Sequence, residues 1–185
     1  VANSFSYHLL GNLGLVAFSG AYGYRETLPY LREACRVVGQ AAPEVRAVLL
    51  LGHWDVSNLG CKLQMDVPTL FDYASRLPGC APFARRGALK FFMGHTHCNV
   101  PHPHGRVDAG FMVAGQGMEG CGNLGVPVVD STLGRLRVWY FPVALGPEEA
   151  GKAVDGRYED LLGCVQEKGW RGCTHLGTLW LNQTL

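Results

Sequence analysis

Histidines gather in one short segment, FFMGHTHCNVPHPH at residues 91–104, which holds four of the seven histidines in the chain. The first pair, His95 and His97, directly follows the apolar run LKFFMG, whereas the second pair alternates with prolines. Another histidine, His53, ends a second apolar run in the same way, after the glycine of LLLGHW. Because imidazole nitrogens bind zinc, iron and other transition metals, this arrangement suggests a metal site.

The two apolar runs are the elements that must position these histidines. VRAVLLLGHW and LKFFMG lack polar–apolar alternation, which is typical of strands covered on both faces. In α/β folds the carboxyl ends of such strands form the edge where ligands usually bind, so His53 should approach His95 and His97 there. In an extended segment His95 and His97 point to one face with Cα atoms roughly 6.5 Å apart. That spacing suits two metal ions about 3.5–4 Å apart.

The remaining pattern predicts a layered α/β or α+β fold. SFSYHLL and LGLVAFSG should be strands joined by a tight turn at Gly11-Asn12, and residues 26–40 should form a helix that starts at Thr27-Leu28-Pro29. A short helix is expected near 67–77, and further strands at FMVAGQG, VPVVDST and RLRVWYFPV. After a polar linker at 147–155, residues 156–185 should form a helical tail, in which TLWLNQTL is expected to be a docking helix.

Composition narrows the function classes. With 185 residues, 48% hydrophobic and 17% charged, the chain suits one globular domain. A net charge of +1 argues against nucleic-acid binding, and no apolar stretch reaches the roughly 18 residues of a membrane span. A basic leader and an initiator Met are both missing, so we expect an internal piece of a longer precursor.

Seven cysteines make the chain cysteine-rich but follow no C-x-x-C metal spacing. They are either paired in disulfides or buried as small apolar residues, and an odd count leaves at least one thiol free if the others pair. Together with the glycosylation pattern Asn182-Gln183-Thr184, they favour a secretory or endomembrane compartment.

MGHTH after a short strand, with LLLGHW about 40 residues earlier, resembles the last two motifs of the calcineurin-like metallophosphoesterases. The resemblance implies a two-sheet sandwich flanked by helices, with two metal ions (Zn, Fe or Mn) at the strand ends. It further implies that His53 and His95 ligate one metal and His97 the other. Residues 1–146 would be the C-terminal portion of that domain, and 147–185 a linker with a helical extension.

The family's upstream motifs, Asp-x-His, Gly-Asp-x-x-Asp and Gly-Asn-His-Asp/Glu, do not occur in this chain. Gly11-Asn12 is followed by Leu13-Gly14, which favours a hairpin turn over a metal ligand at Asn12. Two adjacent cations repel strongly unless they share anionic oxygen. We therefore expect the missing N-terminal half of the precursor to be the partner that supplies the carboxylates, and this chain alone to be inactive.

Two functions remain open. The first is metal-dependent hydrolysis of a phosphoester substrate, in which two metal ions activate a bridging water. The second is a non-catalytic phosphoesterase-like fold that serves as a binding or structural module in a larger assembly. A mononuclear structural zinc site built from His53, His95 and His97 is a third possibility.

The sequence also suggests roles for other residues near these histidines. Asp55 is a turn residue or holds an imidazole by a hydrogen bond, and Trp54 packs or lines the substrate cleft. His102 and His104 are expected in an exposed loop over the cleft, with a separate metal site or a contact to substrate phosphate as alternatives. Cys98 is expected to be a packed thiol rather than a ligand.

Overall fold

The computed structural model describes residues 5–53, 66–95, 98–102, 110–113, 124–144 and 157–185. The chain divides into two compact units: unit 1 comprises residues 1–95 and 102–112, and unit 2 comprises residues 96–101 and 113–184. The described residues form two β-sheets and four α-helices, which confirms the mixed α/β class expected from the sequence.

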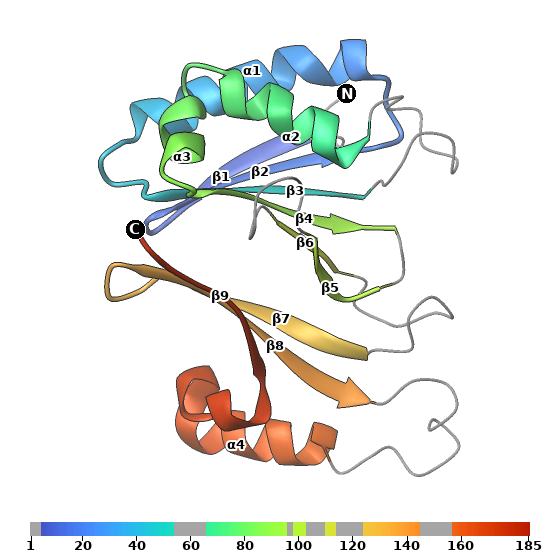
Figure 1. The fold of residues 1–185 in the computed structure, drawn as a ribbon, viewed down its shortest axis with the longest axis vertical. Helices are drawn as coiled ribbons and strands as arrows, with labels where there is room; N and C mark the ends of the chain where they lie inside the picture. Colours follow the sequence, from blue (N-terminus) through green and yellow to red (C-terminus); the bar gives the residue numbers. More distant parts are fainter. Residues whose placement is uncertain (1–4, 54–65, 96–97, 103–109, 114–123, 145–156) are drawn as a thin grey trace. The chain divides into compact units, whose positions relative to one another are not determined.

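Unit 1 is built on a six-stranded sheet (Figure 1). Its strands are β1 (Phe5–Leu10), β2 (Leu13–Ser19), β3 (Ala47–His53), β4 (Leu89–Gly94), β5 (Val100–His102) and β6 (Gly110–Met112). They lie in the order β1-β2-β3-β4-β6-β5. β1 is antiparallel to β2, whereas β2, β3, β4 and β6 run parallel to one another. The parallel arrangement brings the carboxyl ends of these four strands to one edge of the sheet.

The first two strands form the expected hairpin. Gly11 has a φ of +58°, a conformation that glycine adopts at little cost, and it begins the turn between β1 and β2. The carbonyl of Asn12 accepts hydrogen bonds from the backbone N–H groups of Arg46, at 2.7 Å, and Ala47, at 3.3 Å. The turn is thereby fixed to the start of β3, at the amino end of that strand.

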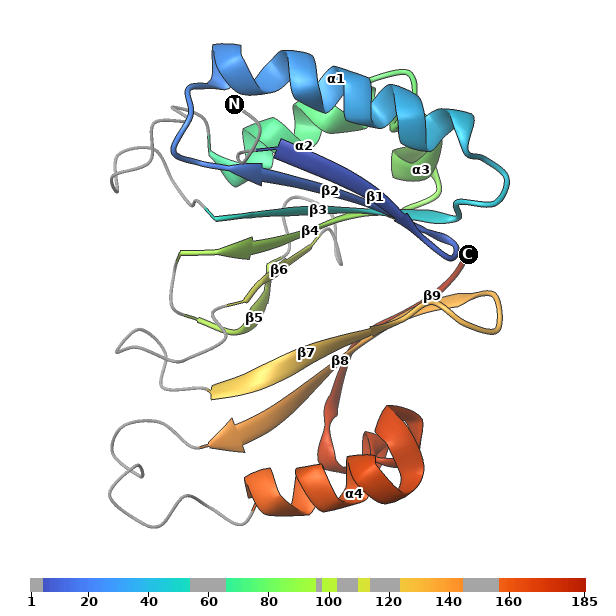
Figure 2. The ribbon, with the colours of Figure 1, turned by 180° about the vertical axis from the view of Figure 1, so that it is seen from behind.

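Helices cover one face of this sheet, as both views of the ribbon show (Figures 1 and 2). They are α1 (Tyr24–Gln40), α2 (Val67–Arg76) and α3 (Ala81–Arg85). The α1 helix buries Leu31, Ala34 and Val38 toward the sheet, in the 3.6-residue periodicity expected from the sequence. A disulfide between Cys35 and Cys80 joins α1 to the residue that precedes α3. Closing a loop of 45 residues contributes about 4 kcal/mol on chain-entropy grounds.

The α1 helix begins earlier than the sequence predicted. Its N-cap is Gly23, whose N–H donates to the Glu26 carboxylate at 2.9 Å, and Pro29 lies inside the helix. The predicted start at Thr27-Leu28-Pro29 is therefore wrong. Pro29 leaves the carbonyl of Arg25 without its helical partner, but both residues are exposed, so water can satisfy that group.

Unit 2 contains a three-stranded antiparallel sheet with one helix against it. The strands are β7 (Leu124–Asp130), β8 (Arg135–Ala144) and β9 (Thr178–Thr184), in the order β7-β8-β9, and the helices are α4 (Arg157–Gly172) and a short 3-10 turn (Thr174–Leu176). Phe141 of β8, Leu161 of α4 and Cys173 form the centre of their shared core. A second disulfide, Cys164–Cys173, ties α4 to the segment that follows it.

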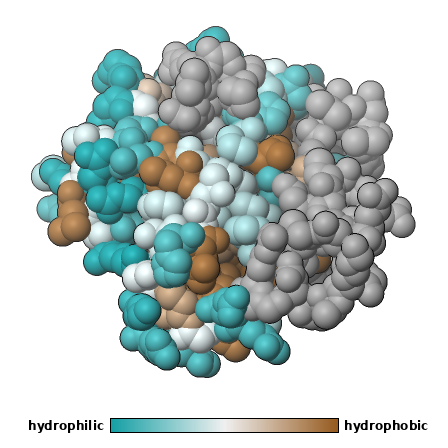
Figure 3. All heavy atoms as spheres, turned by 60° about the horizontal axis from the view of Figure 1, so that its bottom comes forward, coloured by the Kyte–Doolittle hydropathy of each residue, from teal (hydrophilic) through white to brown (hydrophobic). Residues whose placement is uncertain are grey.

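The outer surface of α4 is mixed in character. Tyr158, Leu162 and Trp170 are each at least one-third exposed. Figure 3, which brings this side of unit 2 forward, shows apolar residues in separate groups between hydrophilic ones. Isolated apolar residues of this kind are normal on protein surfaces.

The C-terminal stretch corrects a prediction. α4 confirms a helix after residue 156, but TLWLNQTL is not a docking helix: it forms β9, which pairs with β8. Along β9 the central Leu181 is buried whereas its neighbour Asn182 is exposed, a strand-like alternation. Pairing with β8 provides hydrogen-bond partners for the backbone N–H and C=O groups of β9. Threonine, leucine and tryptophan suit a half-buried sheet surface. The linker predicted at 147–155 lies outside the described residues.

Disulfides decide the state of most cysteines. Cys35, Cys80, Cys98, Cys164 and Cys173 are all disulfide-bonded, so the alternative of buried free thiols is wrong for these five. Disulfides are typical of proteins that fold in an oxidising compartment. Among the described helices, none combines the length and apolar character needed to cross a membrane.

Candidate functional site

The carboxyl edge of the six-stranded sheet collects the candidate ligands. In the parallel register Ser19 of β2 lies opposite His53 of β3, and His53 lies opposite Gly94 of β4. His95 therefore emerges beside His53, one residue beyond the end of β4. This convergence is the one expected from two buried strands that both end in Gly-His.

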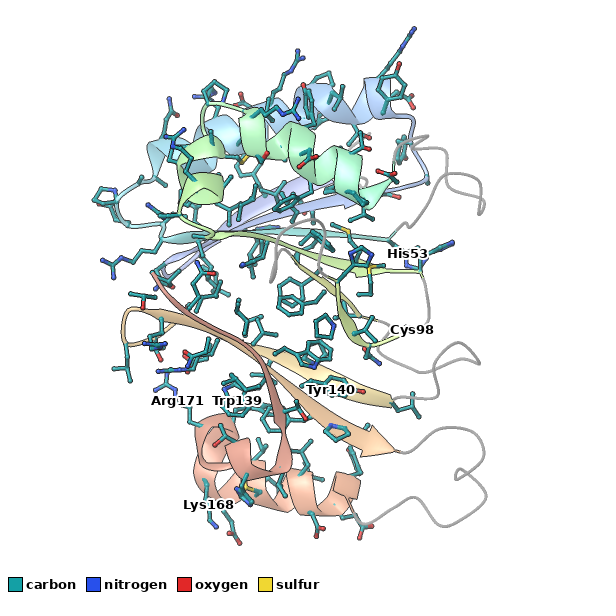
Figure 4. The ribbon with its side chains drawn as sticks, viewed as in Figure 1. His53, Cys98, Trp139, Tyr140, Lys168 and Arg171 are labelled. Atoms are coloured by element: carbon teal, nitrogen blue, oxygen red, sulfur yellow. A yellow bond between two sulfur atoms is a disulfide. The ribbon has the colours of Figure 1, made fainter. Side chains whose placement is uncertain are left out.

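His53 and His95 turn ring nitrogens toward each other (His53 is labelled in Figure 4). Nδ1 of His95 lies 3.3 Å from Nε2 of His53, and the ring planes are perpendicular, with centroids 5.2 Å apart. His53 is exposed and His95 is half-buried, so both rings can be reached from solvent. Two nitrogens that each bind a tetrahedral zinc at roughly 2.05 Å would lie about 3.3 Å apart. The pair therefore fits two ligands of one metal ion.

The backbone at His95 is unusual. Its φ is +108°, a region that residues with a side chain rarely adopt, and it directly follows Gly94 at the end of the buried strand. Such conformations cost on the order of 1–3 kcal/mol and concentrate at functional sites. Strain at the residue whose ring faces His53 supports a functional role for this strand end.

Four of the predicted site residues cannot be placed. His97, Trp54, Asp55 and His104 lie outside the described residues, so their roles stay predictions. Within the described part of the chain, no group of three or more histidine, cysteine, aspartate or glutamate side chains is close enough to hold a metal ion. The described site is therefore the pair of His53 and His95.

Asn12 does not belong to this site. It lies at the hairpin turn next to Ala47, at the amino end of β3, whereas His53 lies at the carboxyl end of the same strand. Six residue steps along a strand separate the two ends by roughly 20 Å. The turn interpretation of Gly11-Asn12 is confirmed.

His102 is not in an exposed loop, as the prolines around it had suggested. It ends β5, is half-buried, and packs its ring edge-on against Phe91 of β4, with centroids 5.8 Å apart. Its Nδ1 is buried and has no hydrogen-bond partner among the described residues. The extended backbone expected at Pro101 is confirmed, and it forms strand β5, which joins the sheet.

The expectation for Cys98 is wrong, and the sequence did not single out Asn99 or Tyr140. Cys98 is disulfide-bonded, so it is neither the packed thiol expected nor a metal ligand, and its neighbour Asn99 is buried (Cys98 is labelled in Figure 4). Burial raises the pKa of Tyr140 to about 12, although the nearby Asn99 side chain lowers it. The Tyr140 hydroxyl makes no well-formed hydrogen bond within the described residues, and its ring stacks on Trp180, with centroids 4.6 Å apart. Tyr140 is therefore kept neutral at physiological pH.

No protein-family model, curated protein or solved structure matches this chain. The function must therefore be argued from the geometry of the histidine pair, together with the motifs that surround it in the sequence.

Proposed function

We propose that this chain contributes the histidine half of a metal-dependent phosphoesterase of the calcineurin-like type, within a longer precursor. The observation that carries the proposal is the 3.3 Å approach of two ring nitrogens, at the carboxyl ends of two adjacent parallel strands. In this proposal the two β-sheets correspond to the two sheets of the family's sandwich. The substrate is a phosphoester.

The separation of the histidine pair is compatible with a shared metal as well as with a mutual hydrogen bond. At 3.3 Å, Nδ1 of His95 and Nε2 of His53 lie within hydrogen-bond reach and also at the separation of two nitrogen ligands of one tetrahedral zinc ion. A shared ion uses the same two nitrogens as ligands in their neutral form. In this proposal the unfavourable φ of His95 is retained because it turns the ring toward His53.

Bound zinc, iron or manganese ions would supply Lewis acidity toward phosphate oxygens and a water acidic enough to attack at neutral pH. The chain's own contribution is to fix the ligands: β3 and β4 lie in the interior of the sheet, so His53 and His95 are held on a rigid edge. His97, two residues beyond His95, would ligate the second ion. The bridging carboxylate and the remaining acidic ligands would come from the precursor.

The full-length protein tests the proposal through hydrolysis of an aryl phosphate and through its metal content. His53→Ala, His95→Ala and His97→Ala should each lower activity at least a hundredfold and reduce bound metal. His8→Ala is the matched control, because His8 is an exposed histidine in the middle of β1 of the same sheet and should change neither quantity. Equal activity in the wild type and the His97→Ala variant would overturn the assigned site. A full-length protein with neither metal nor activity would support the non-catalytic module instead.

A further inference from the structure

A modification motif lies in β9, away from the edge that carries His53 and His95. Asn182 is followed by Gln183 and Thr184, which matches the acceptor pattern Asn-X-Ser/Thr of N-linked glycosylation. No other asparagine in the chain is followed at this spacing by serine or threonine. An N-linked glycan on this chain would therefore have to be at Asn182.

The two essential side chains of the motif lie on one exposed face of the strand. Successive residues of a strand point to opposite faces, so Asn182 and Thr184 share a face. Both are exposed, whereas Leu181, on the other face, is buried. Within the described residues β9 is the last strand in the order β7-β8-β9. A bulky hydrophilic glycan at Asn182 therefore requires no rearrangement of the core.

The amide of Asn182 is oriented by its oxygen. Nε of Arg135 donates to Oδ1 of Asn182 at 2.7 Å. Within the described part of the chain, Nδ2 of Asn182, the atom to which an N-linked glycan is attached, makes no hydrogen bond. A glycosylated asparagine is still an amide and keeps its carbonyl oxygen, so the bond from Arg135 can persist after modification. The folded strand is thus compatible with the modified side chain.

The residue opposite Asn182 turns its charged group away from it. Arg137 of β8 lies opposite Asn182 in the register of the two strands. Its guanidinium donates to Asp130 at 3.1 Å, and Asp130 belongs to β7, on the other side of β8. A glycan at Asn182 therefore does not need to break this ion pair.

The cysteines give independent support for the compartment that the modification needs. In eukaryotic cells N-linked oligosaccharides are transferred in the endoplasmic reticulum, where proteins also acquire disulfides. Five cysteines are disulfide-bonded: Cys35, Cys80, Cys98, Cys164 and Cys173. Disulfides are rare in cytosolic proteins, so the pattern at Asn182 and the disulfides point to the same compartment.

We propose that Asn182 carries an N-linked glycan. The donor is an oligosaccharide joined to a lipid diphosphate. Nδ2 of Asn182 forms a bond to the anomeric carbon of the first sugar and loses one proton, while the bond from that carbon to the diphosphate oxygen breaks and the lipid diphosphate leaves with the electron pair. Transfer takes place before β9 pairs with β8, and the exposed face of β9 then accommodates the glycan. The proposal does not depend on metal binding by the histidines.

The test uses the full-length protein expressed in eukaryotic cells that perform N-linked glycosylation. Peptide-N-glycosidase F, used in heavy-oxygen water, releases the glycan and converts the modified asparagine to labelled aspartate. Peptide mass spectrometry should find this label at residue 182. A peptide that contains unmodified Asn182, with no glycosylated form of it, would overturn the proposal.

Variants locate the modification. Asn182→Gln and Thr184→Ala should each abolish it, because each removes one part of the acceptor pattern, whereas Thr184→Ser keeps the hydroxyl and should retain it. Thr178→Ala is the matched control: Thr178 is an exposed threonine at the other end of β9, outside the pattern, and its variant should be modified as the wild type is. Cell-associated and secreted protein are both analysed, so a variant that folds poorly still reports whether it was modified. A glycan retained in Thr184→Ala would overturn the proposal.

Discussion

At the carboxyl ends of β3 and β4 the side chains are histidines, whereas arginines lie near the amino ends of the same strands, carried by α1 and by the segment after α3. The histidine edge presents imidazole nitrogens from residues at the ends of buried strands, one of them in a strained conformation. Near the amino ends, Arg32, Arg36 and Arg86 line an open pocket beside the Cys35–Cys80 disulfide. One sheet thus has imidazole side chains at one end and guanidinium side chains near the other.

The pocket and the histidine edge also differ in how complete they are. The pocket has its walls, floor and charges within the described residues, whereas the histidine edge needs further ligands to hold a metal tightly. We therefore expect metal binding at the histidine edge to need ligands beyond these two histidines.

Removal of the Cys35–Cys80 disulfide should have the largest effect. The Cys35→Ala/Cys80→Ala double variant should lose about 4 kcal/mol of unfolding free energy, because its closed loop spans 45 residues. The matched Cys164→Ala/Cys173→Ala variant, with a separation of 9 residues, should lose about 2.6 kcal/mol. Urea unfolding measures both. A smaller loss for the longer loop would contradict the chain-entropy explanation of this stabilisation.

Metal analysis of the isolated 185-residue chain tests the incompleteness of the histidine edge. We expect a metal-to-protein ratio near zero after dialysis, because two imidazoles without carboxylates hold a divalent ion only weakly. Elemental analysis of the purified chain, beside the full-length protein, makes the measurement. A ratio of one that is lost in the His95→Ala variant would favour the mononuclear zinc site and would remove the need for acidic ligands from the precursor.

Substitution of His95 by glycine and by alanine measures the strain at the carboxyl edge. Glycine adopts a φ of +108° without the steric cost of a Cβ, so His95→Gly should be more stable than His95→Ala by about 1 kcal/mol. Thermal unfolding of the two variants gives the difference, and neither should retain the metal-dependent activity. At His53, which has no positive φ, alanine should be at least as stable as glycine. Equal stability of the two His95 variants would argue against backbone strain there.

The histidine edge was predictable because its signal is local. A continuous apolar run that ends in Gly-His indicates a buried strand and a residue at its carboxyl end, and two such runs place His53 near His95. The conformation of His95 was not predictable, since it depends on how the chain leaves the sheet. The start of α1 was missed because Pro29 is a stronger sequence signal than Gly23, although Gly23 and Glu26 make the actual cap.

The arginine pocket could not have been predicted from the sequence. Arg32 and Arg86 are far apart in the chain, and the packing of the turn at residues 77–79 against α1, with the disulfide between residues 35 and 80, brings them to one pocket. β9 was missed for a related reason. TLWLNQTL is compatible with a helix or a strand by composition, and the open edge of β8, a tertiary feature, decides between them.

A cluster of charges in unit 2 pairs two arginines with one carboxylate. Asp130 of β7 accepts from Arg137 at 3.1 Å and from Arg171 at 3.3 Å, and its side chain is only 13% exposed (Arg171 is labelled in Figure 4). Burial by itself raises the pKa of the Asp130 carboxyl, but the hydrogen bonds from Thr132 and the Arg171 guanidinium outweigh it and hold this pKa below its usual value. Asp130 offsets one of the two positive charges, and both arginines share it as their carboxylate partner.

The lowered pKa of Asp130 gives the smallest of the expected effects, and its sign follows from linkage. Because the folded pKa lies below the unfolded one, the contribution to stability is complete above the unfolded pKa, about 3.9, and is lost as the pH falls through the folded pKa. Between pH 6 and pH 3 the wild type should therefore lose more stability than Asp130→Asn, which is less stable at pH 6 but has no carboxyl to protonate. Unfolding in urea at several pH values measures this difference. Parallel pH profiles would mean that Asp130 does not hold its arginines as described.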